Sequence, residues 1–470
     1  MKSYRNVPPL AGICSPQDAL REGLSVDECV RRLKRYHYAF KRLHQTFTAR
    51  IPAEPIYELK MAFSLHAHLC AEHVGTLRKR VGEMREPPLG LDVVPEPSLE
   101  IFFDEILSAP TTEELLLGLY ARAIPALQAA LQAHMAATNP VVDQPSVRVC
   151  RFALLELADM AAFGSQTITA LGLNPPSAQQ SEWLRLLDDA LAAAGGLDGT
   201  KERPVATLTR HYSAKPLQFN FVPRRDQRFA DPFNMGVNAE AFIYNPDYPP
   251  DAKVLMMFFK RLREIDVPEM MASIIVETKG KPWEYYRAMS RQLWDEARHA
   301  LMGEVGFASL GVDWTKAQVN FSFSYALNTM LTPLERHGVL YFIEQGLMPK
   351  AGKRFEYELA QAARNPISML CQDYDWADEV LHAHIGREWY VADFKNAAEA
   401  KNFGDQSWFK MFWNYTKWAD EGLTQHRNWW PDVYLEYCRQ TGIKPDEKVL
   451  AYHETYETTR ADLKEVTGSA

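Results

Sequence analysis

A nine-residue pattern occurs twice in this 470-residue chain, as DEARHALMG at 295–303 and as DEVLHAHIG at 378–386. Both copies have the form D-E-x-x-H-A-x-x-G. Residues three apart on a helix share one face, so each Glu-x-x-His can present a carboxylate and an imidazole to the same point. Two such pairs on facing helices, joined by one Glu from each of two further helices, form the ligand set of a carboxylate-bridged dimetal site in a four-helix bundle.

One Glu-x-x-His is common on helices and usually marks an exposed carboxylate near a histidine that has a hydrogen-bond partner. Two copies with matching flanks, each inside a helical pattern, favour a metal site instead. The repeat therefore predicts four ligands, which are Glu296, His299, Glu379 and His382.

Helix spacing indicates where the remaining ligands lie. The ranges 251–277 and 283–310 both have helical patterns, and the sequence TKGKP at 278–282 separates them. Such a break is a good helix stop, so the two helices should form an antiparallel hairpin. Counting outward from Gly280 places Glu264 level with Glu296. We therefore expect Glu264 to be the bridging carboxylate of the first helix.

An alternative ligand on the same helix is Glu269, which lies five residues nearer the turn, or roughly 7 Å along the axis. Pro268 bears on the choice, because a proline removes the hydrogen bond to the carbonyl four residues earlier, which belongs to Glu264. The sequence predicts either a kink at the ligand or a helix that ends near Pro268, in which case Glu264 would lose its role.

The second half of the site has a similar spacing. A helical pattern beginning near residue 333 carries Glu344, which precedes Glu379 by 35 residues, close to the 32 residues between the first two glutamates. The fourth helix is expected over 366–390. Interruptions at 349–352 and 365–366 leave open which of them forms the turn.

Mixed carboxylate and imidazole donors suit iron or manganese better than the thiolate-rich surroundings of structural zinc. Asp295 and Asp378 precede the motif glutamates and are candidates for accepting a hydrogen bond from a metal-bound histidine. Asp375, one turn before Glu379, is a candidate extra ligand or outer-shell base. For Asp295 and Asp378, an exposed helix acid is the alternative.

The two D-E-x-x-H segments resemble those of the ferritin-like di-iron carboxylate superfamily. The first copy matches the D-E-x-R-H form of its bacterial multicomponent monooxygenases, with Arg298 as the arginine, whereas the second has Leu381 there. The resemblance covers about residues 250 to 390. It implies a four-helix bundle, bridging glutamates, and dioxygen or peroxide chemistry at two iron ions or a manganese–iron pair.

Within that superfamily, Gly303 occupies the place where the small subunit of ribonucleotide reductase carries its radical tyrosine, which argues against that role. The chain is also too long for an iron-storage ferritin. Gly303 and Gly386 could open a cavity beside the metals, or could allow close helix packing. Tyr341, one turn before Glu344, is a candidate for electron transfer or a packed core residue.

We therefore expect an oxidoreductase, an oxidase or oxygenase that uses dioxygen on a small organic substrate. This expectation leaves room for an external electron donor and for a homodimer. The alternative is a ferritin-like binding or scaffold protein without turnover, and a dimetal hydrolase is a third class.

The composition also excludes several other classes of protein. The chain is 47% hydrophobic and 24% charged, with a net charge of −8, which is typical of a globular protein and unsuited to nucleic acid. The N-terminus lacks an apolar signal core and no apolar run could cross a bilayer, so we expect a cytoplasmic protein with no membrane partner. Six cysteines without a C-x-x-C pair should be reduced and mostly structural.

The predicted fold is all-α, with two ferritin-like bundles in tandem. We expect a degenerate bundle over 1–200, an irregular linker over 201–250, the dimetal bundle over 251–395, and an aromatic-rich helical extension over 396–470. In the first bundle Glu72 and Glu156 lie at places comparable to the motifs but lack the histidine three residues later. That bundle is therefore expected to have no equivalent metal site.

Overall fold

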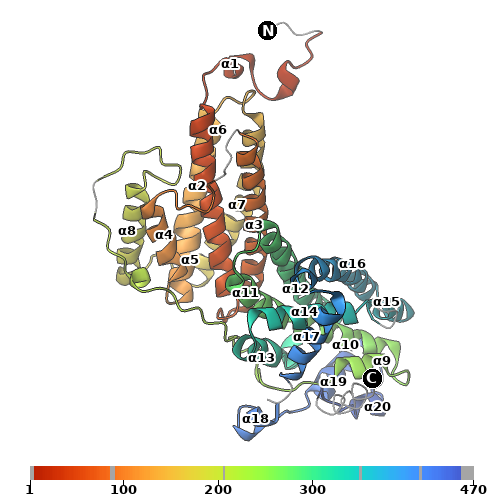
Figure 1. The fold of residues 1–470 in the computed structure, drawn as a ribbon. Helices are drawn as coiled ribbons and strands as arrows, with labels where there is room; N and C mark the ends of the chain where they lie inside the picture. Colours follow the sequence, from red (N-terminus) through yellow and green to blue (C-terminus); the bar gives the residue numbers. More distant parts are fainter. Residues whose placement is uncertain (1–4, 85–89, 205–206, 349–351, 412–414, 457–470) are drawn as a thin grey trace. The chain divides into compact units, whose positions relative to one another are not determined.

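The computed structural model describes residues 5–84, 90–204, 207–348, 352–411 and 415–456. In these ranges the chain forms helices joined by loops and no β-strand, which confirms the all-α class (Figure 1). None of the described helices is long and apolar enough to cross a membrane. The chain divides into two compact units, the first comprising Met1–Phe47 and His66–Phe219 and the second comprising Thr48–Leu65 and Asn220–Ala470.

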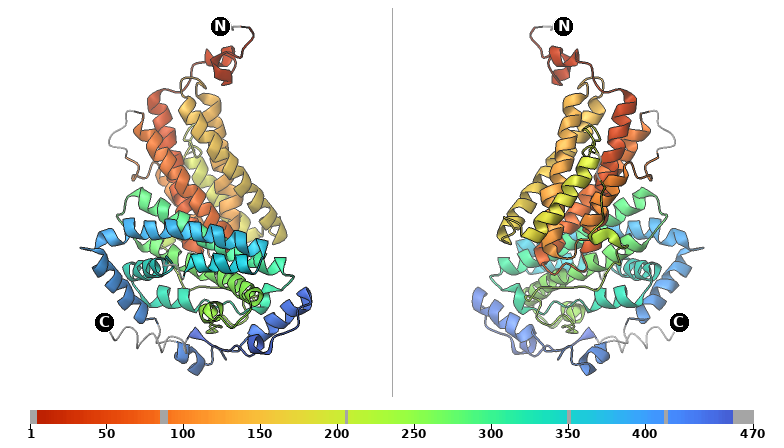
Figure 2. Two further views of the ribbon diagram at one scale, coloured as in Figure 1. Left: turned by 90° about the vertical axis from the view of Figure 1, so that its right-hand side faces the viewer. Right: turned by 90° about the vertical axis from the view of Figure 1, so that its left-hand side faces the viewer.

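The first unit is built on four long helices that lie side by side (Figures 1 and 2). Tyr36 of α2 donates a hydrogen bond to the carbonyl of Ala130 in α6 at 3.2 Å. The Phe40 ring of α2 lies 4.8 Å from the His73 ring of α3, and His73 lies 2.7 Å from Glu156 of α7. Since α6 also packs on α7, each helix has two neighbours and the ring is closed. The four are α2 (Val26–Arg50), α3 (Tyr57–Gly82), α6 (Ile124–Ala137) and α7 (Gln144–Ala170).

Shorter helices complete this unit. The helices α4, α5 and α8 pack on one another, and Ser177 and Gln180 form a capping box that starts α8. These elements are η1 (Leu10–Gly12), α1 (Pro16–Ala19), α4 (Pro97–Leu107), α5 (Thr112–Gly118), the π-helical turn η2 (Leu119–Ala123), α8 (Ala178–Ala193) and η3 (Tyr212–Ala214).

The second unit has a core of four helical segments, again in a closed ring of neighbours. The segment α10–η4–α11 packs on α12, α12 on α16, α16 on α14, and α14 on α11. These elements are α10 (Pro250–Leu262), η4 (Arg263–Ile265), α11 (Asp266–Glu277), α12 (Trp283–Ser309), α14 (Pro333–Gly346) and α16 (Pro366–Trp389). The predicted hairpin, its stop at 278–282 and the third and fourth helices are therefore present.

Local sequence explains where these helices begin. Thr332 and Glu335 form a capping box at the start of α14, and Asn365 accepts a hydrogen bond from the Ser368 N–H at the start of α16. The connection between these two helices contains a further helix, and the predicted interruption at 365–366 separates it from α16. Residues 349–351 of the other predicted interruption lie outside the described residues. The remaining elements are α9 (Ala239–Tyr244), η5 (Trp314–Lys316), α13 (Ser322–Met330), α15 (Lys353–Ala362), η6 (Val391–Asp393), α17 (Ala397–Phe409), α18 (Tyr415–Asp420), α19 (Trp430–Thr441) and α20 (Glu447–Leu450).

The segment predicted as an irregular linker over 201–250 is only partly irregular. It contains η3 and α9, and from Asn220 onward it belongs to the second unit. The aromatic-rich C-terminal region also belongs to that unit. Trp429 is buried with its ring 4.3 Å from that of Phe259 in α10, so here the aromatic residues pack against the bundle. Residues 412–414 of that region lie outside the described residues.

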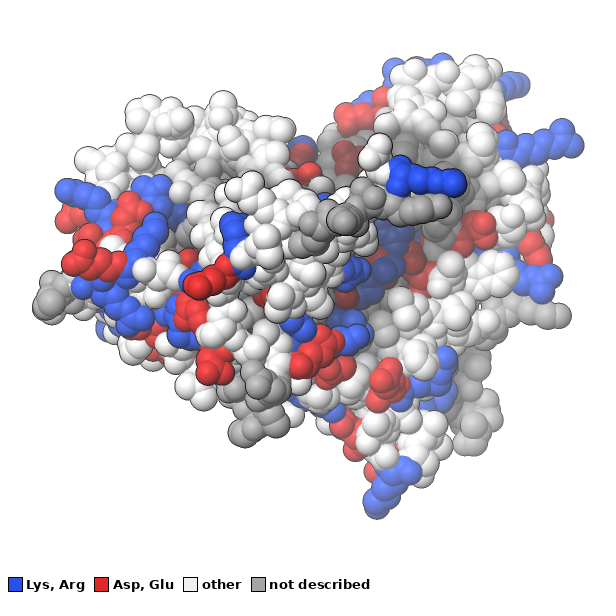
Figure 3. Space-filling model, turned by 90° about the horizontal axis from the view of Figure 1, so that it is seen from above, with Lys and Arg blue, Asp and Glu red and all other residues white. Residues whose placement is uncertain are grey.

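Basic and acidic side chains are interspersed on the face drawn in Figure 3. No single sign of charge dominates that face, in keeping with the small net charge of −8 for 470 residues.

Candidate metal centre

The six predicted ligands come from four segments of the second unit. Glu264 lies in the 3₁₀ turn η4, Glu344 in α14, and the two motifs in α12 and α16. This turn lies directly between α10, which ends at Leu262, and α11, whose first turn contains Pro268. The α-helix is thus interrupted at the ligand, as expected from the missing N–H of the proline.

The predicted ligands gather into two groups of donors that share one residue. The first position is formed by Glu264, His299, Asp375 and Glu379, and the second by Glu296, Glu344, Glu379 and His382. Within each group the donor atoms all lie within 4.8 Å of one another. Asp375, expected as an extra ligand or an outer-shell base, belongs to the first position. Glu379 belongs to both positions.

Distances between donor atoms identify the residues between the two positions. His299 Nδ1 lies 3.2 Å from Glu264 Oε2 and 3.6 Å from Glu296 Oε2. His382 Nδ1 lies 3.1 Å from Glu296 Oε1 and 3.3 Å from Glu379 Oε2. Glu296 therefore faces both histidines. The motif glutamates thus lie between the two positions, whereas Glu264, the expected bridging carboxylate, faces only the first position.

The motif aspartates pair with the histidines crosswise. Asp378 Oδ2 lies 3.1 Å from His299 Nε2, and Asp295 Oδ2 lies 3.5 Å from His382 Nε2. Arg298 joins the two aspartates, with Nη2 2.7 Å from Asp295 Oδ1 and 2.6 Å from Asp378 Oδ2. Each aspartate thus holds the histidine of the other motif by its Nε2 atom, which leaves Nδ1 directed at the carboxylates.

Several donor atoms at the two positions are buried without a hydrogen bond. Buried polar atoms are almost always hydrogen-bonded, so a group of exceptions at one place points to a ligand. The atoms are Nδ1 of His299 and His382 and one carboxylate oxygen each of Glu264, Glu344 and Glu379. A mixed set of imidazole nitrogen and carboxylate oxygen fits iron or manganese ions.

Two cations that the sequence analysis missed lie beside the first position. Lys353 Nζ of α15 is 2.8 Å from both Asp375 Oδ1 and Glu379 Oε1. Arg261 Nη2 lies 3.0 Å from Glu264 Oε1, and its Nη1 forms an ion pair with Asp375. Arg261 precedes Glu264 by three residues, a spacing that could have revealed it. Lys353 lies in the connection that the ligand spacing left open, so no motif marked it.

These charges act on the ionisation of the carboxylates. Burial opposes ionisation of Glu264, but Arg261 and Lys353 lower its pKa to about 2. Burial likewise opposes ionisation of Glu379, yet Lys353 holds its pKa well below the usual range. At the second position, by contrast, burial and the neighbouring Glu379 raise the pKa of Glu344 well above the usual range. The first position is therefore charge-compensated by the protein and the second is not.

Acidic neighbours set the pKa values of the two imidazoles. Burial alone would lower the pKa of His299, but Asp375 and the surrounding carboxylates raise it well above its usual range. Burial would also lower the pKa of His382, but Asp295, Glu296 and Glu379 raise it well above its usual range. Both rings are thus set in an acidic environment that favours positive charge.

The alternative ligand Glu269 does not join either group. It is fully buried in a separate ion-pair cluster, with Oε1 2.8 Å from Lys60 Nζ and Oε2 3.0 Å from Arg225 Nη2. Its carboxylate is thereby neutralised by two cations. The assignment of Glu269 as an alternative ligand is wrong, since the η4 turn directs Glu264 to the metal positions.

Of the two interpretations of the motif glycines, the structure favours close packing over a cavity. A Cβ on Gly303 would lie 2.6 Å from the Leu262 Cα, and a Cβ on Gly386 would lie 2.5 Å from the Tyr341 Cδ2. Close packing therefore explains both glycines, and the cavity interpretation of Gly303, Gly386 and Tyr341 is wrong. The Tyr341 ring also packs 5.2 Å from that of Tyr390, as a core residue. A cavity of about 740 Å³ does lie in the unit, but C-terminal residues such as Leu435 line it and none of the ligand residues does.

The chain was compared with protein-family models, curated proteins and solved structures, and none of these matches it.

Proposed function

We propose that this protein is a non-haem dimetal oxidoreductase of the ferritin-like superfamily. In this proposal Glu264, Glu296, His299, Glu344, Glu379 and His382 hold two iron ions, or a manganese–iron pair. The substrate class is a small organic molecule that is oxidised at the expense of dioxygen. We also propose that the four-helix arrangement of the first unit is a degenerate copy of the same bundle.

The observation that carries this proposal is the convergence of buried donor atoms that lack hydrogen bonds. Nδ1 of both histidines and one oxygen each of three glutamates face one another at the two positions. Without a metal these atoms have only one another as partners, such as His299 Nδ1 at 3.2 Å from Glu264 Oε2 and His382 Nδ1 at 3.3 Å from Glu379 Oε2, and burying so many ionisable groups together is costly. Divalent metal ions would satisfy all of them together.

The chain's own residues keep the donors in place. Gln292 Nε2 donates a hydrogen bond to Glu344 Oε1 at 3.0 Å, which holds that carboxylate toward the second position. Asp295 and Asp378 orient His382 and His299 through their Nε2 atoms. Such outer partners fix the ring orientation and increase the basicity of the ligand nitrogen. When bound, iron would supply the electrons that reduce dioxygen.

Lys353 adds a buried positive charge at the first position. Its ammonium group is buried, and Nζ lies 2.8 Å from oxygen atoms of Asp375 and Glu379. Burial and Arg261 would lower the pKa of this lysine, but the surrounding carboxylates raise it well above its usual range. The ammonium therefore holds its proton beside the carboxylates. Reduction of dioxygen consumes protons, and this group is positioned to hold one there.

Metal analysis followed by exposure to oxygen tests this function. Protein purified without oxygen is expected to contain about two iron ions per chain. Admission of oxygen should then change its absorption spectrum. Glu296→Ala should lose most of the metal, because this residue faces both histidines. Failure of the folded wild type to bind metal would overturn the proposal, as would full occupancy in Glu296→Ala.

The second candidate is a binding or scaffold protein without turnover. Lys353 and Arg261 favour it, because their charges already neutralise the carboxylates of the first position. In that case the bundle holds one metal ion or none, and oxygen causes no spectral change. The same measurement therefore separates the two functions.

A further inference from the structure

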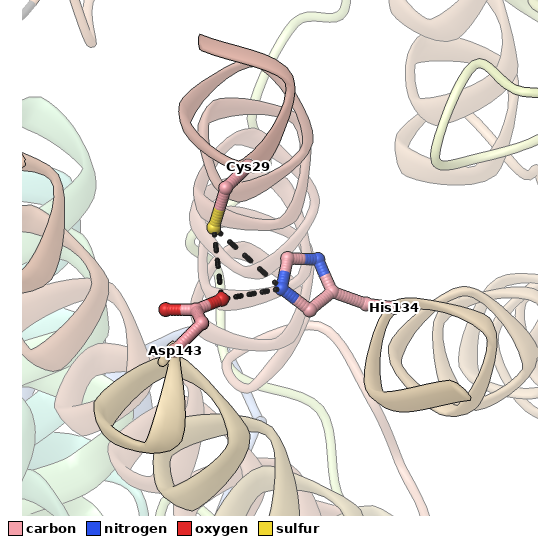
Figure 4. A group of neighbouring side chains, drawn as sticks. All are labelled: Cys29, His134 and Asp143. Carbon is pink, nitrogen blue, oxygen red and sulfur yellow. Dashed lines mark hydrogen bonds and ion pairs between the residues drawn. The ribbon is translucent and has the colours of Figure 1, made fainter. Parts of the chain in front are cut away.

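A second group of metal-binding side chains lies in the first unit, where α6 connects to α7. Cys29 comes from the first turn of α2, His134 from the last turn of α6, and Asp143 from the residue that precedes α7 (Figure 4). This group contains neither Glu72 nor Glu156, the residues at places comparable to the two motifs. Its residues are far apart in the chain and form no short motif.

The three donor atoms converge on one point. Cys29 Sγ lies 3.3 Å from Asp143 Oδ2 and 3.7 Å from His134 Nε2. His134 Nε2 lies 3.7 Å from the same Asp143 oxygen, which completes a triangle (Figure 4). All three residues are buried, with exposed fractions of 2% for Cys29, 0% for His134 and 8% for Asp143.

The geometry differs from that of a nucleophile and its base. In a catalytic relay one ring nitrogen of the histidine faces the nucleophile and the other faces the orienting acid. Here the same nitrogen, Nε2 of His134, faces both the sulfur and the carboxylate. The other nitrogen, Nδ1, is buried without a hydrogen bond. The arrangement is therefore a ligand triangle and not a relay.

The direction of the Asp143 side chain gives independent support. An aspartate before the first turn of a helix usually accepts a hydrogen bond from a backbone N–H of that turn. Asp143 occupies this place in α7 but makes no such bond. Its Oδ1 accepts a hydrogen bond from Arg80 Nη2 at 2.9 Å, and its Oδ2 is directed at Cys29 and His134. The carboxylate thus contacts Cys29 and His134 instead of capping the helix.

We propose that Cys29, His134 and Asp143 bind a structural zinc ion. Tetrahedral zinc, with bonds of about 2.3 Å to sulfur, 2.05 Å to nitrogen and 2.1 Å to oxygen, separates its donors by about 3.6 Å for S···N and S···O and about 3.4 Å for N···O. The observed separations of 3.7, 3.3 and 3.7 Å lie within about 0.3 Å of these values. Thiolate, imidazole and carboxylate are all zinc ligands.

The surroundings fit a closed site. Ser146 Oγ and Met84 Sδ lie 3.7 and 4.0 Å from the Cys29 sulfur. Thr138 Oγ1 donates a hydrogen bond to Asp143 Oδ2 at 2.9 Å. Zinc binding displaces the thiol proton to solvent, and the charges of thiolate and carboxylate then balance the ion. A zinc ion here would tie the start of α2 to the α6–α7 connection.

Cobalt(II) provides the direct test, because a cobalt–thiolate bond has a near-ultraviolet charge-transfer absorption that carboxylate and imidazole ligands do not produce. Full-length protein is freed of metal by a chelator, checked for its helical circular dichroism, and titrated with cobalt(II). We expect the thiolate absorption in the wild type and its loss in Cys29→Ser. In a zinc competition assay the wild type should bind one more equivalent than Cys29→Ser.

Two matched variants control for the other sulfur atoms. Cys150 is buried in the same unit but belongs to no donor group, and Cys371 is the cysteine of the helix that carries Asp375. Cys150→Ser and Cys371→Ser should both keep the absorption and the extra equivalent of zinc. A folded wild type without the absorption, or an absorption that persists in Cys29→Ser, would overturn the proposal. Neither outcome bears on the dimetal site, whose candidate ligands contain no sulfur.

Discussion

The two metal positions of the second unit have similar donors but different surroundings. Each has one histidine, and both share Glu379. Beside the first position lie Lys353 and Arg261, which form ion pairs with its carboxylates. The ion pairs of the described residues place no lysine or arginine against Glu344 at the second position, where Gln292 Nε2 lies 3.0 Å and His382 Nδ1 3.9 Å from its Oε1.

The same carboxylate-rich arrangement can therefore be stabilised in two ways. Burying several carboxylates together is costly unless opposite charge accompanies them. At the first position the protein supplies that charge itself, and the pKa of Glu264 falls to about 2, against the opposing effect of burial. At the second position, burial and Glu379 raise the pKa of Glu344, so a proton or a metal ion must supply the charge. We therefore expect the second position to bind metal more tightly than the first.

The largest effect is expected from Glu379→Ala, because this residue belongs to both positions. Removing the shared carboxylate should reduce the metal content from about two ions per chain to less than one. Metal analysis after dialysis against a weak chelator measures this. Glu388→Ala is the matched control, since Glu388 lies on the same helix with a half-exposed side chain and should leave the metal content unchanged. Equal loss in both variants would refute the shared role of Glu379.

The crossed aspartates allow each position to be weakened separately. Asp378→Asn should weaken metal binding at the position of His299, and Asp295→Asn at the position of His382, by about 10–100-fold each. The reason is that each aspartate orients the histidine of the other motif. Two-step metal titrations measure both affinities.

Double-mutant cycles test the crossing itself. Asp378→Asn should have little further effect once His299 is replaced by Ala, but should keep its full effect in His382→Ala. The reverse should hold for Asp295→Asn. Coupling within one motif, such as Asp295 with His299, would contradict the crossed arrangement.

Lys353→Met tests whether the ammonium group causes the difference between the positions. Without it a metal ion at the first position no longer competes with a buried cation, so its affinity should rise at least about tenfold. The metal-free protein should lose about 3–5 kcal/mol of unfolding free energy, because Asp375 and Glu379 lose a buried partner. Isothermal titration and urea denaturation measure the two effects.

Lys253→Met is the matched control for this change. Lys253 is also buried, but it lies on α10 and belongs to neither donor group. It should leave both metal affinities unaltered. If Lys353→Met also left them unaltered, the electrostatic account of the difference would fail.

The sequence was sufficient for the ligands whose positions follow from helix geometry. A fixed rise per residue and a clear stop at 278–282 placed Glu264 level with Glu296, and the structure brings both to the same centre. It was insufficient for Lys353, because the connection between α14 and α16 contains a helix of its own that spacing could not orient. It was also insufficient for Cys29, His134 and Asp143. Their meeting depends on how three helices pack, which no local pattern encodes.

The sequence could not tell which carboxylate faces both histidines for a related reason. Counting along a hairpin gives the height of a residue but not the direction of its side chain. The η4 turn directs Glu264 toward His299 alone, whereas Glu296, inside a regular helix, faces both histidines. A local departure from α-helical geometry thus sets which carboxylate faces both histidines.

The smallest effects are expected from the two motif glycines, which again differ between the positions. A methyl group on Gly303 would meet the backbone of Leu262, two residues before Glu264, whereas one on Gly386 would meet the ring of Tyr341. Because a ring can turn aside more easily than a helix backbone can shift, Gly303→Ala should cost about 1–3 kcal/mol of unfolding free energy and Gly386→Ala less. Urea denaturation compares them.

Gly346→Ala is the control for helix propensity, since nothing lies within 4 Å of a Cβ at that position. It should be neutral or slightly stabilising, because alanine favours a helix over glycine by up to about 1 kcal/mol. Gly303→Ala should in addition weaken metal binding at the first position only, since it displaces the turn that carries Glu264. If Gly303→Ala behaved like Gly346→Ala, the close approach of η4 to α12 would not be what holds the first position in place.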